Sequence, residues 1–551
     1  MARFALFLNG VKVETLDELK ENFNIMDMLA NFRNKGLHRW LAMNRLTEEL
    51  SQIEAISGQE DDDIINELAR VFGVSADMIK EQSRLQMQAV KKTEEVLSKL
   101  EKELLTNTER TDFLKYMDDS PDTQSVIDLL RKHAEQGNPV AQLKWGWCLD
   151  YAKGVEKNSE LAVECYKKSA KQGLAHAQNS LGYCFQNGIG IAKDDTQAVF
   201  WYQKSADQNF HSGLNNLGWC YEFGIGVEKN FSEAIRLYTT AADLNDSCAE
   251  NNLGRCYQNG VGIEKNLEKA AFWYRKSAEH GNHDGQCNLG ECYEMGTGVE
   301  KNQEEAVKCY RKAAEQGHPA AQNRLGLCYD RGVGVKSNPE EAAKWYEKSA
   351  NQGYPEGEIN FGWCFLEGFG IKKDIEMGVT WYRKAAEQGY AFAQKRMGDF
   401  YREGNFVSAN PQISAQWYER ASKGGDVGAQ DWLGWCYREG FGVDKNYNLA
   451  FFWFKQGAEK GLASAQCNLA YCYEKGLGTC KDLETAYTWY YRSAQQGNSE
   501  AQFNMGWFEA NGIGTTKDRD AAKRWYKRAA DQGHRQAREN LENMDKITRL
   551  W

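Results

Sequence analysis

The chain has 551 residues, of which 42% are hydrophobic and 26% are charged, and its formal net charge is -10. This acidic balance argues against nucleic acid as a general partner. No apolar run approaches the roughly 18 residues that a membrane helix needs, and the first ten residues lack the long apolar stretch and cleavage site of a secretory signal. These features predict a cytoplasmic protein that binds neither nucleic acid nor a membrane.

The first part of the chain, residues 1–82, predicts a small and mostly helical module with a short β-hairpin. Asn9-Gly10 separates the apolar stretches Phe4–Leu8 and Val11–Val13, and this dipeptide accepts the positive φ of a type I′ turn. The run from Thr15 to Glu18 has the spacing of a capping box, which should open a helix. Further helices are expected over Met26–Asn34, Leu37–Ile56 and Asp61–Val71, and another should begin at Ser75.

The second part, residues 83–123, predicts a long amphipathic helix followed by a linker. From Ser83 to Leu105 the apolar residues keep a spacing of three or four, but the run is too short to indicate a coiled coil. The stretch Thr106–Thr123, which contains Pro121, is typical of a linker.

The remainder, residues 124–551, is dominated by one unit of 36 residues that is copied eleven times without insertion or deletion. The Gly of a Leu-Gly pair serves as position zero of each copy. This position is occupied by Gly146, Gly182, Gly218, Gly254, Gly290, Gly326, Gly362, Gly398, Gly434, Ala470 and Gly506. A period of this length is the signature of a solenoid, in which each unit buries its apolar face against its neighbours.

Each unit is predicted to be a helical hairpin, with a helix A and a helix B. Position +12 is always Asn or Asp, as at Asn266, and these residues are preferred N-caps. Gly at positions +6 and +8, as at Gly260 and Gly262, supplies the turn before that cap. On helix A, positions -5, -1, +2 and +3 share one apolar face, and on helix B a Trp-Tyr pair adds bulk. Residues 124–137 resemble the second half of a unit and should cap the N-terminal end, and Arg538–Trp551 should form a closing helix.

The fifteen cysteines are predicted to be reduced and mostly buried. Nine of them occupy position +2: Cys148, Cys184, Cys220, Cys256, Cys292, Cys328, Cys364, Cys436 and Cys472. Equivalent helices of neighbouring units lie ~8–10 Å apart, which exceeds the Cα separation of roughly 4.4–6.8 Å that a disulfide tolerates. They are therefore expected to be small core residues in a reducing compartment.

The unit resembles the Sel-one-like repeat, a relative of the tetratricopeptide repeat. The resemblance rests on residues such as Ala321-Gln322, Leu325-Gly326, Asn338, Trp345-Tyr346 and Gly353, and it covers about residues 124–541. It implies an all-α fold, a right-handed α/α solenoid of eleven hairpins whose A helices line a concave face. It also implies an adaptor or scaffold that binds other proteins. Some secreted bacterial members carry a disulfide in each repeat, but this sequence lacks the paired cysteines; residues 1–120 resemble no family.

Two columns of helix A are candidates for a partner-binding surface, because they lie away from the core stripe. Position +1 holds Trp147, Tyr183, Trp219, Trp363, Trp435, Tyr471 and Trp507. Position -2 holds Asn216, Asn252, Asn288, Asn360, Asn468 and Asn504. Trp is favoured at interface hot spots, and an Asn amide can both donate to and accept from the backbone of an extended peptide. The alternative is structural: the aromatic side chains pack between repeats, and the Asn side chains bridge neighbouring A helices.

Candidates for chemistry are few, and no cofactor, metal or enzyme activity is predicted. The cluster His280, His283, Cys287 and Cys292 matches no standard zinc spacing. The favoured function is an adaptor whose solenoid binds a protein or extended peptide, while the N-terminal module self-associates or passes the binding event on. The alternative is an enzyme or regulatory subunit whose catalytic site lies in the N-terminal module or in a composite groove.

Overall fold

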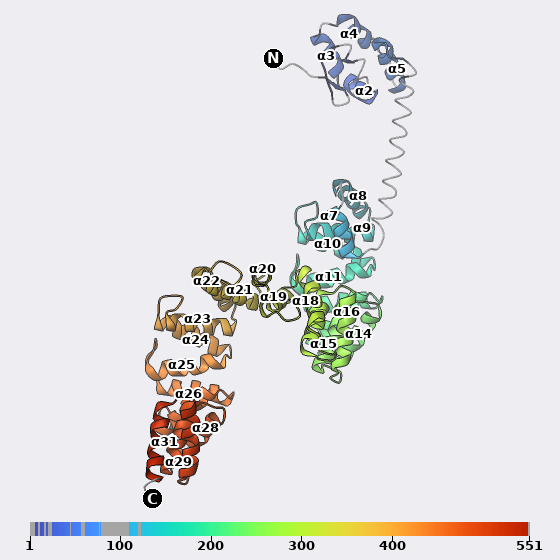
Figure 1. Ribbon diagram of the computed structural model, residues 1–551. Helices are drawn as coiled ribbons and strands as arrows, with labels where there is room; N and C mark the ends of the chain where they lie inside the picture. The colour runs from blue at the N-terminus through green and yellow to red at the C-terminus, as the bar shows by residue number, and fades with distance from the viewer. Residues whose placement is uncertain are drawn as a thin grey trace. The chain divides into compact units, whose positions relative to one another are not determined.

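The computed structural model describes residues 6–8, 11–15, 18–19, 25–44, 46–56, 61–75, 78, 109–119 and 123–548 (Figure 1). The chain divides into two units, Met1–Ser205 and Ala206–Trp551. Within the described residues the fold is almost entirely helical, as the sequence predicts, with one two-stranded sheet near the N-terminus. No helix in these ranges is long and apolar enough to cross a membrane.

The N-terminal module contains the predicted β-hairpin. Strand β1 (Leu6–Leu8) pairs antiparallel with β2 (Val11–Val13), and Leu6 lies opposite Val13. The Asn9-Gly10 turn lies outside the described residues. The predicted capping box is present: the Glu18 backbone N–H donates to Thr15 Oγ1 (3.2 Å), and the Thr15 N–H donates to Glu18 Oε2 (3.3 Å).

Helices α2 (Ile25–Arg33), α3 (Gly36–Met43), α4 (Thr47–Glu54) and α5 (Asp61–Phe72) share one apolar core with the hairpin. Trp40 is buried there and donates its indole N–H to the Val13 carbonyl (3.0 Å), which joins α3 to the hairpin. The prediction of one helix over Leu37–Ile56 is wrong, because two separate helices, α3 and α4, occupy this range. Asn44 ends α3 and donates its side chain to the Trp40 carbonyl (2.9 Å), a local bond that competes with helix continuation.

The segment predicted as a linker contains a helix, and this corrects the expectation for Thr106–Thr123. Helix α7 (Arg110–Asp119) buries Phe113 and Met117 in the same apolar cluster as the first repeats. The long amphipathic helix expected over Ser83–Leu105 lies outside the described residues. Most of the helix expected to begin at Ser75 also lies outside the described residues, although the Met78 backbone N–H donates to Ser75 Oγ (3.2 Å), as an N-cap requires.

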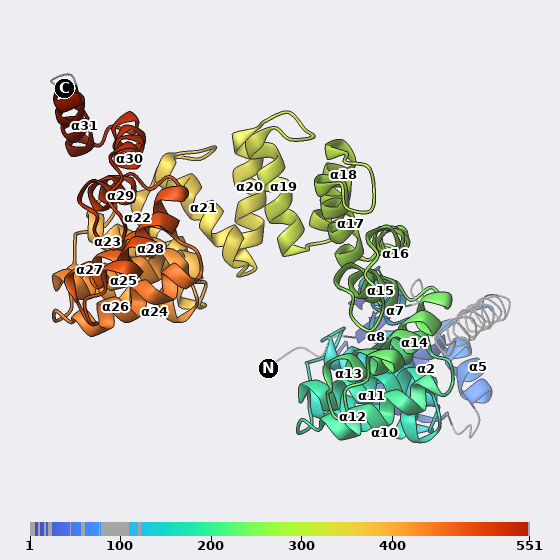
Figure 2. The same cartoon turned by 90° about the horizontal axis from the view of Figure 1, so that it is seen from below.

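The repeats form the predicted helical hairpins. The A helices are α9 (Pro139–Asp150), α11 (Ala175–Asn187), α13 (His211–Phe223), α15 (Ser247–Asn259), α17 (His283–Met295), α19 (Pro319–Arg331), α21 (Pro355–Glu367), α23 (Ala391–Glu403), α25 (Val427–Glu439), α27 (Ala463–Lys475) and α29 (Ser499–Asn511). The B helices are α10 (Ser159–Lys171), α12 (Asp195–Ala206), α14 (Phe231–Asp243), α16 (Leu267–Glu279), α18 (Gln303–Glu315), α20 (Pro339–Asn351), α22 (Ile375–Glu387), α24 (Pro411–Lys423), α26 (Tyr447–Glu459), α28 (Leu483–Gln495) and α30 (Arg519–Asp531). Figure 2 shows one such pair, α19 and α20, side by side. Helix α8 (Thr123–Glu135) precedes the first repeat, and α31 (Arg535–Thr548) follows the last.

The hairpin turn forms as the repeat columns predict. In the unit that contains α15 and α16, Asn266 caps helix B by accepting from the Lys269 backbone N–H (2.9 Å). Gly260 and Gly262 have φ of 73° and 68°, a region that disfavours other residues. A Cβ at Gly262 would also lie 2.6 Å from the Cβ of Phe231 in the preceding unit. This glycine therefore allows the close stacking of one repeat on the next.

The repeat core explains why position zero is almost always Gly. A Cβ at Gly254 would lie 2.5 Å from the ring of Tyr274 on the partner helix of the same hairpin. Leu253 and Cys256 are buried on either side of that glycine, and Tyr274 is fully buried. The small residue on helix A is therefore matched to the large ring on helix B.

All fifteen cysteines lie in the described residues, and each is a free thiol. The nine at position +2 are buried, and only Cys248 and Cys480 are exposed. Burial raises the pKa of the Cys248 thiol to about 11 even though part of the residue is exposed.

We expect Cys480 to react first with a thiol reagent, since only Cys248 and Cys480 are exposed and the raised pKa of Cys248 disfavours its reactive thiolate. Native protein should label at Cys480 quickly and at Cys248 slowly, whereas denatured protein should label at all fifteen positions. The Cys480→Ser variant should lose the fast phase. A low thiol content in freshly denatured, unreduced protein would contradict the free-thiol arrangement.

Candidate partner-binding face

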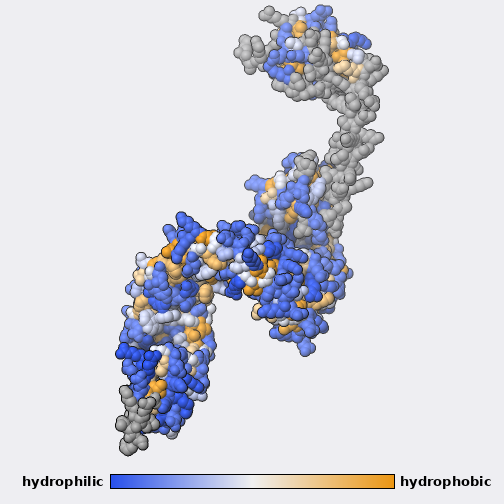
Figure 3. Space-filling view, viewed as in Figure 1, coloured by the Kyte–Doolittle hydropathy of each residue, from blue (hydrophilic) through white to orange (hydrophobic). Residues whose placement is uncertain are grey.

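The aromatic residues at position +1 are not equally exposed. Tyr183, Trp219, Tyr471 and Trp507 are exposed by 38–45%. Large exposed aromatic groups on successive A helices are unusual for a packed core and are typical of a binding surface. On the face visible in Figure 3, apolar patches interrupt a mostly hydrophilic surface of the unit that follows Ser205.

Trp147 does not belong to the exposed set, because its side chain is 1% exposed. Its ring contacts Phe113 of α7 at 5.8 Å and His176 of α11 at 5.7 Å, between centroids. The prediction that Trp147 offers a surface to a partner is therefore corrected: α7 covers it, and this helix lies outside the repeat pattern on which the prediction was based.

Trp363 and Trp435 are partly buried and take part in packing between elements. The Trp363 ring lies 4.8 Å from that of Phe369. The Trp435 ring lies 5.2 Å from that of Phe441 and 5.6 Å from that of Trp432. Both tryptophans thus combine a structural contact with a remaining exposed surface.

The Asn residues at position -2 bridge neighbouring A helices. Asn252 donates its amide to Asn215 Oδ1 at 2.9 Å, and this pair spans two successive repeats. The same bond recurs between Asn288 and Asn251 (2.8 Å), Asn360 and Asn323 (2.8 Å), and Asn468 and Asp431 (2.9 Å). One N–H of each of these four amides is therefore engaged within the solenoid. Within the described residues, the Oδ1 atoms of Asn252, Asn288 and Asn360 accept no hydrogen bond.

A cavity of about 440 Å³ brings several predicted residues together in the C-terminal repeats. Asn468, Tyr471 and Asn504 line it. Arg438 also lines it, lies over the Tyr471 ring at 5.7 Å and donates to Asn468 Oδ1 (3.1 Å). The columns at +1 and -2 are thus adjacent in space here, as the helical spacing predicts.

An ion pair replaces the aromatic residue of position +1 in the fourth repeat. Arg255 forms a bidentate pair with Glu222 (2.7 and 2.8 Å), which is buried and also accepts from the Tyr238 hydroxyl (2.8 Å). The Arg255 guanidinium also lies over the rings of Trp219 and Phe223, at 5.4 and 5.5 Å. The sequence interpretation missed Phe223, although its position four residues after Trp219 on one helix face could have indicated it.

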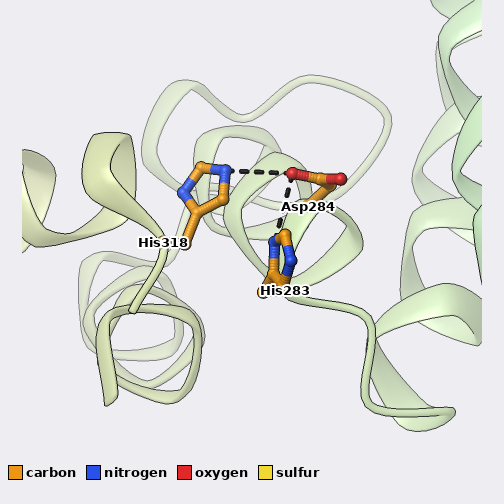
Figure 4. Close-up of side chains that lie close together, drawn as sticks. All are labelled: His283, Asp284 and His318. Carbon is orange, nitrogen blue, oxygen red and sulfur yellow. Dashed lines mark ion pairs between the residues drawn. The ribbon is translucent and has the colours of Figure 1, made fainter. Parts of the chain in front are cut away.

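The histidine and cysteine residues singled out as a metal-like cluster do not come together. His280 pairs with Glu250 (2.8 Å), and burial raises the pKa of Cys287 to about 12. His283 instead lies near Asp284 and His318, as Figure 4 shows. His318 Nε2 lies 3.0 Å from Asp284 Oδ1, and His318 Nδ1 accepts from the Ala321 backbone N–H (3.0 Å).

His318 is thus an N-cap of α19 with one nitrogen and a partner of Asp284 with the other. A ligand nitrogen must carry no proton, whereas His318 in this arrangement carries its proton on Nε2. The same arrangement recurs at His534, which caps α31 at Ala537 and contacts Glu500 (3.2 Å). The recurrence indicates a capping device of the fold rather than a metal centre.

A buried carboxylate departs from the repeat pattern at position -4. Eight repeats have Gln there, and its amide donates to a carbonyl at the end of the preceding B helix, as Gln322 does to Ala314 (3.1 Å). Glu250 holds this position in the fourth repeat and is fully buried. Its Oε2 pairs with His280, but its Oε1 has no partner among the described residues. Burial raises the pKa of Glu250, against the opposing effect of His280 and Lys276.

Glu250→Gln should raise the free energy of unfolding by about 1 kcal/mol at neutral pH, since an amide can donate a hydrogen bond where the ionised carboxylate cannot. A raised pKa in the folded state means that the wild type is most favoured when Glu250 is protonated, and that it loses this contribution as the pH rises. The stability difference measured by urea unfolding should therefore shrink as the pH falls from neutral toward the ordinary pKa of a glutamate. The reverse change, Gln322→Glu, should destabilise at neutral pH. Equal midpoints for Glu250→Gln and wild type at neutral pH would contradict this prediction.

Comparison with known proteins identifies the repeat. The family model described as the Sel1 repeat matches eleven consecutive segments, from residues 139–174 to residues 499–534. The chain therefore belongs to the Sel1 repeat family. A search of curated proteins gave no match.

One solved structure supports this assignment, and two others share sequence similarity with parts of the chain. A protective antigen present in uropathogenic Escherichia coli strains, which displays an SLR fold, is 30% identical, and the match covers 76% of this chain and 90% of that chain with a TM-score of 0.55. A Sel1 repeat protein from Oxalobacter formigenes is 30% identical over 56% of this chain and 90% of that chain, with a TM-score of 0.42. The cysteine rich protein B of Helicobacter pylori is 31% identical over 23% of this chain and 92% of that chain, with a TM-score of 0.20.

Proposed function

We propose that this chain is a scaffold that binds a protein partner along the A helices of its Sel1 repeats. The observation that carries the proposal is the row of exposed aromatic residues at position +1, above all Trp219 and Tyr471. Tryptophan and tyrosine dominate the energetics of protein interfaces because they bury a large apolar area and keep a polar group. In this proposal the aromatic row supplies most of the affinity, and no catalytic group is required.

The Asn row has a smaller role in the proposed surface. One N–H of Asn252, Asn288 and Asn360 already bridges neighbouring A helices, which fixes the orientation of each amide and leaves one N–H fewer for a partner. The support for an extended partner is therefore weaker than the support for the surface itself.

The N-terminal module completes the proposal as the part that self-associates or passes the binding event on. Its own apolar core, which includes the buried Trp40, supports a unit with its own stability. The free state of all fifteen cysteines supports a reducing, cytoplasmic compartment.

The proposal can be tested by placing a photo-reactive amino acid at position 219 of the full-length protein. A partner polypeptide should cross-link from this position, because the exposed ring of Trp219 would lie within the interface. The matched control is position 272 on helix α16, where Phe272 is 49% exposed but lies on a B helix. Cross-links of equal yield from both positions would contradict a binding surface on the A helices.

A further inference from the structure

In the first repeat the aromatic residue at position +1 is already covered, and the element that covers it is a helix of the same chain. Helix α7 lies against the side of α9 that carries positions -2, +1 and +5, occupied by Lys144, Trp147 and Tyr151. Phe113 contacts the Trp147 ring, and Lys144 Nζ lies 5.1 Å from the centre of the Phe113 ring. Met117, four residues after Phe113, is buried in the same cluster.

Charged contacts fix the direction of α7 on this surface. At its N-terminal end Glu109 lies 3.3 Å from His176, at the start of α11, and Arg110 lies over the Tyr151 ring at 5.4 Å. At its C-terminal end Asp118 pairs with Lys153 (2.6 Å), just beyond α9. Helix α7 therefore crosses α9, with one end at the start of α11 and the other end at the loop that follows α9.

The position of α7 explains why the aromatic residues at position +1 differ in exposure. Trp147 is 1% exposed, whereas Trp219 and Trp507, which occupy the same position in other repeats, are exposed by 38% and 39%. An amphipathic helix thus buries what the neighbouring repeats leave open. Burial of Lys144 in the same place lowers its pKa to about 8, which agrees with the exclusion of water by α7.

The third repeat offers the same surface, and no helix among the described residues covers it. Among the eleven repeats, only the first and the third have an aromatic residue at both +1 and +5: Trp147 with Tyr151, and Trp219 with Phe223. The rings of Trp219 and Phe223 lie 4.3 Å apart, and each keeps more than a third of its surface exposed. Arg255 is held beside them by the buried carboxylate of Glu222, so that the patch is preformed.

We propose that the partner segment bound by this face is an amphipathic helix with Phe and Met four residues apart, and that it docks on Trp219 and Phe223 of α13 as α7 docks on α9. This inference rests on the proposed scaffold function and specifies the partner. A helix satisfies its own backbone hydrogen bonds and needs only apolar side-chain contacts from the row. Such a partner does not depend on the Asn row, in which one N–H of Asn252 and of Asn288 already bridges neighbouring A helices.

The probe is a peptide of residues 109–119, acetylated, amidated, fluorescently labelled, and stapled between the exposed positions 115 and 119 to favour a helix. It should bind the full-length protein saturably in fluorescence anisotropy. Trp219→Ala and Phe223→Ala should each weaken binding about thirtyfold, as expected for a central aromatic anchor. Trp219→Phe should retain most of the affinity, which separates loss of the contact from loss of the fold, and Phe272→Ala should bind as the wild type does.

A second peptide with Phe113→Ala should bind at least tenfold more weakly than the first. The inference is overturned if the stapled peptide does not bind, if Trp219→Ala binds it as tightly as the wild type, or if both peptides bind equally. If position 219 cross-links to a partner but the protein does not bind these peptides, the proposed scaffold function stands and the proposed helical partner is rejected. If the protein shows neither cross-linking nor peptide binding, both proposals are rejected.

Discussion

Replacing Tyr274 by alanine should lower the free energy of unfolding by about 3–5 kcal/mol, the usual cost of removing a fully buried aromatic side chain. Tyr274 is 1% exposed and fills the space that Gly254 leaves open on the opposite helix. Its hydroxyl also donates to the Gln258 side chain. The change therefore creates a cavity in the core of a hairpin and removes a partly buried hydrogen bond.

The measurement is urea unfolding followed by circular dichroism, with hydrogen exchange of α15 and α16 as a local readout. Stability in a solenoid depends on nearest-neighbour contacts, so the fastest exchange should appear in this hairpin and its neighbours. Tyr447→Ala is the control, because Tyr447 is 39% exposed and should cost well under ~1 kcal/mol. An equal loss in both variants would mean that the ring-on-glycine contact does not stabilise the repeat.

Removing the positive charge at Arg255 should cost about 3 kcal/mol, because the change leaves a buried carboxylate without its cation. Glu222 is 3% exposed, and Arg255 forms two hydrogen bonds to it. Arg255→Met keeps most of the side-chain volume and deletes the pair. The Tyr238 hydroxyl continues to donate to Glu222, which limits the loss but does not neutralise the charge.

Adding Glu222→Gln to Arg255→Met should recover much of this loss, since a neutral amide is less costly to bury than an unpaired carboxylate. The matched control is Arg236→Met on helix α14. Arg236 also pairs with a glutamate, Glu233, but the arginine is 61% exposed, and exposed pairs contribute about 0–1 kcal/mol. Similar unfolding free energies for Arg255→Met and Arg236→Met would contradict a stabilising role for the buried pair.

The repeat fold could be predicted from the sequence because each column has one physical role. Asn266 accepts from the first turn of helix B, Gly262 allows the stacking of neighbouring repeats, and Gly254 faces a tyrosine ring. Each of these roles depends on contacts that recur with the period of the sequence. The same prediction therefore follows independently from each of the eleven in-register copies.

The candidate site could be predicted only in part, because its exposure depends on segments outside the repeat. Nothing in the periodicity indicates that α7 covers Trp147, since Phe113 and Met117 precede the first unit. For the Asn row, the sequence alone is consistent with both a bridging role and a partner-binding role. A pairing signal exists in the sequence, because Asn252 follows Asn215 by 37 residues and an Asn or Asp recurs at the matching position before Asn288, Asn360 and Asn468. The sequence does not show that these residues form hydrogen bonds to one another, because that depends on the distance between neighbouring A helices.

The central claim is that the aromatic row binds a partner rather than holding the repeats together, and one comparison tests it most directly. Melting temperature and partner capture should be measured side by side for Trp219→Ala, Trp363→Ala and Leu253→Ala. Leu253 is 1% exposed and its loss should cost ~2–5 kcal/mol of stability. The Trp219 variant should melt near the wild type and lose capture about thirtyfold. The partly buried Trp363 should give an intermediate melting temperature with a similar loss of capture. If the Trp219 variant melts as early as the Leu253 variant, or folds normally and captures the partner at full strength, the row is not the binding surface.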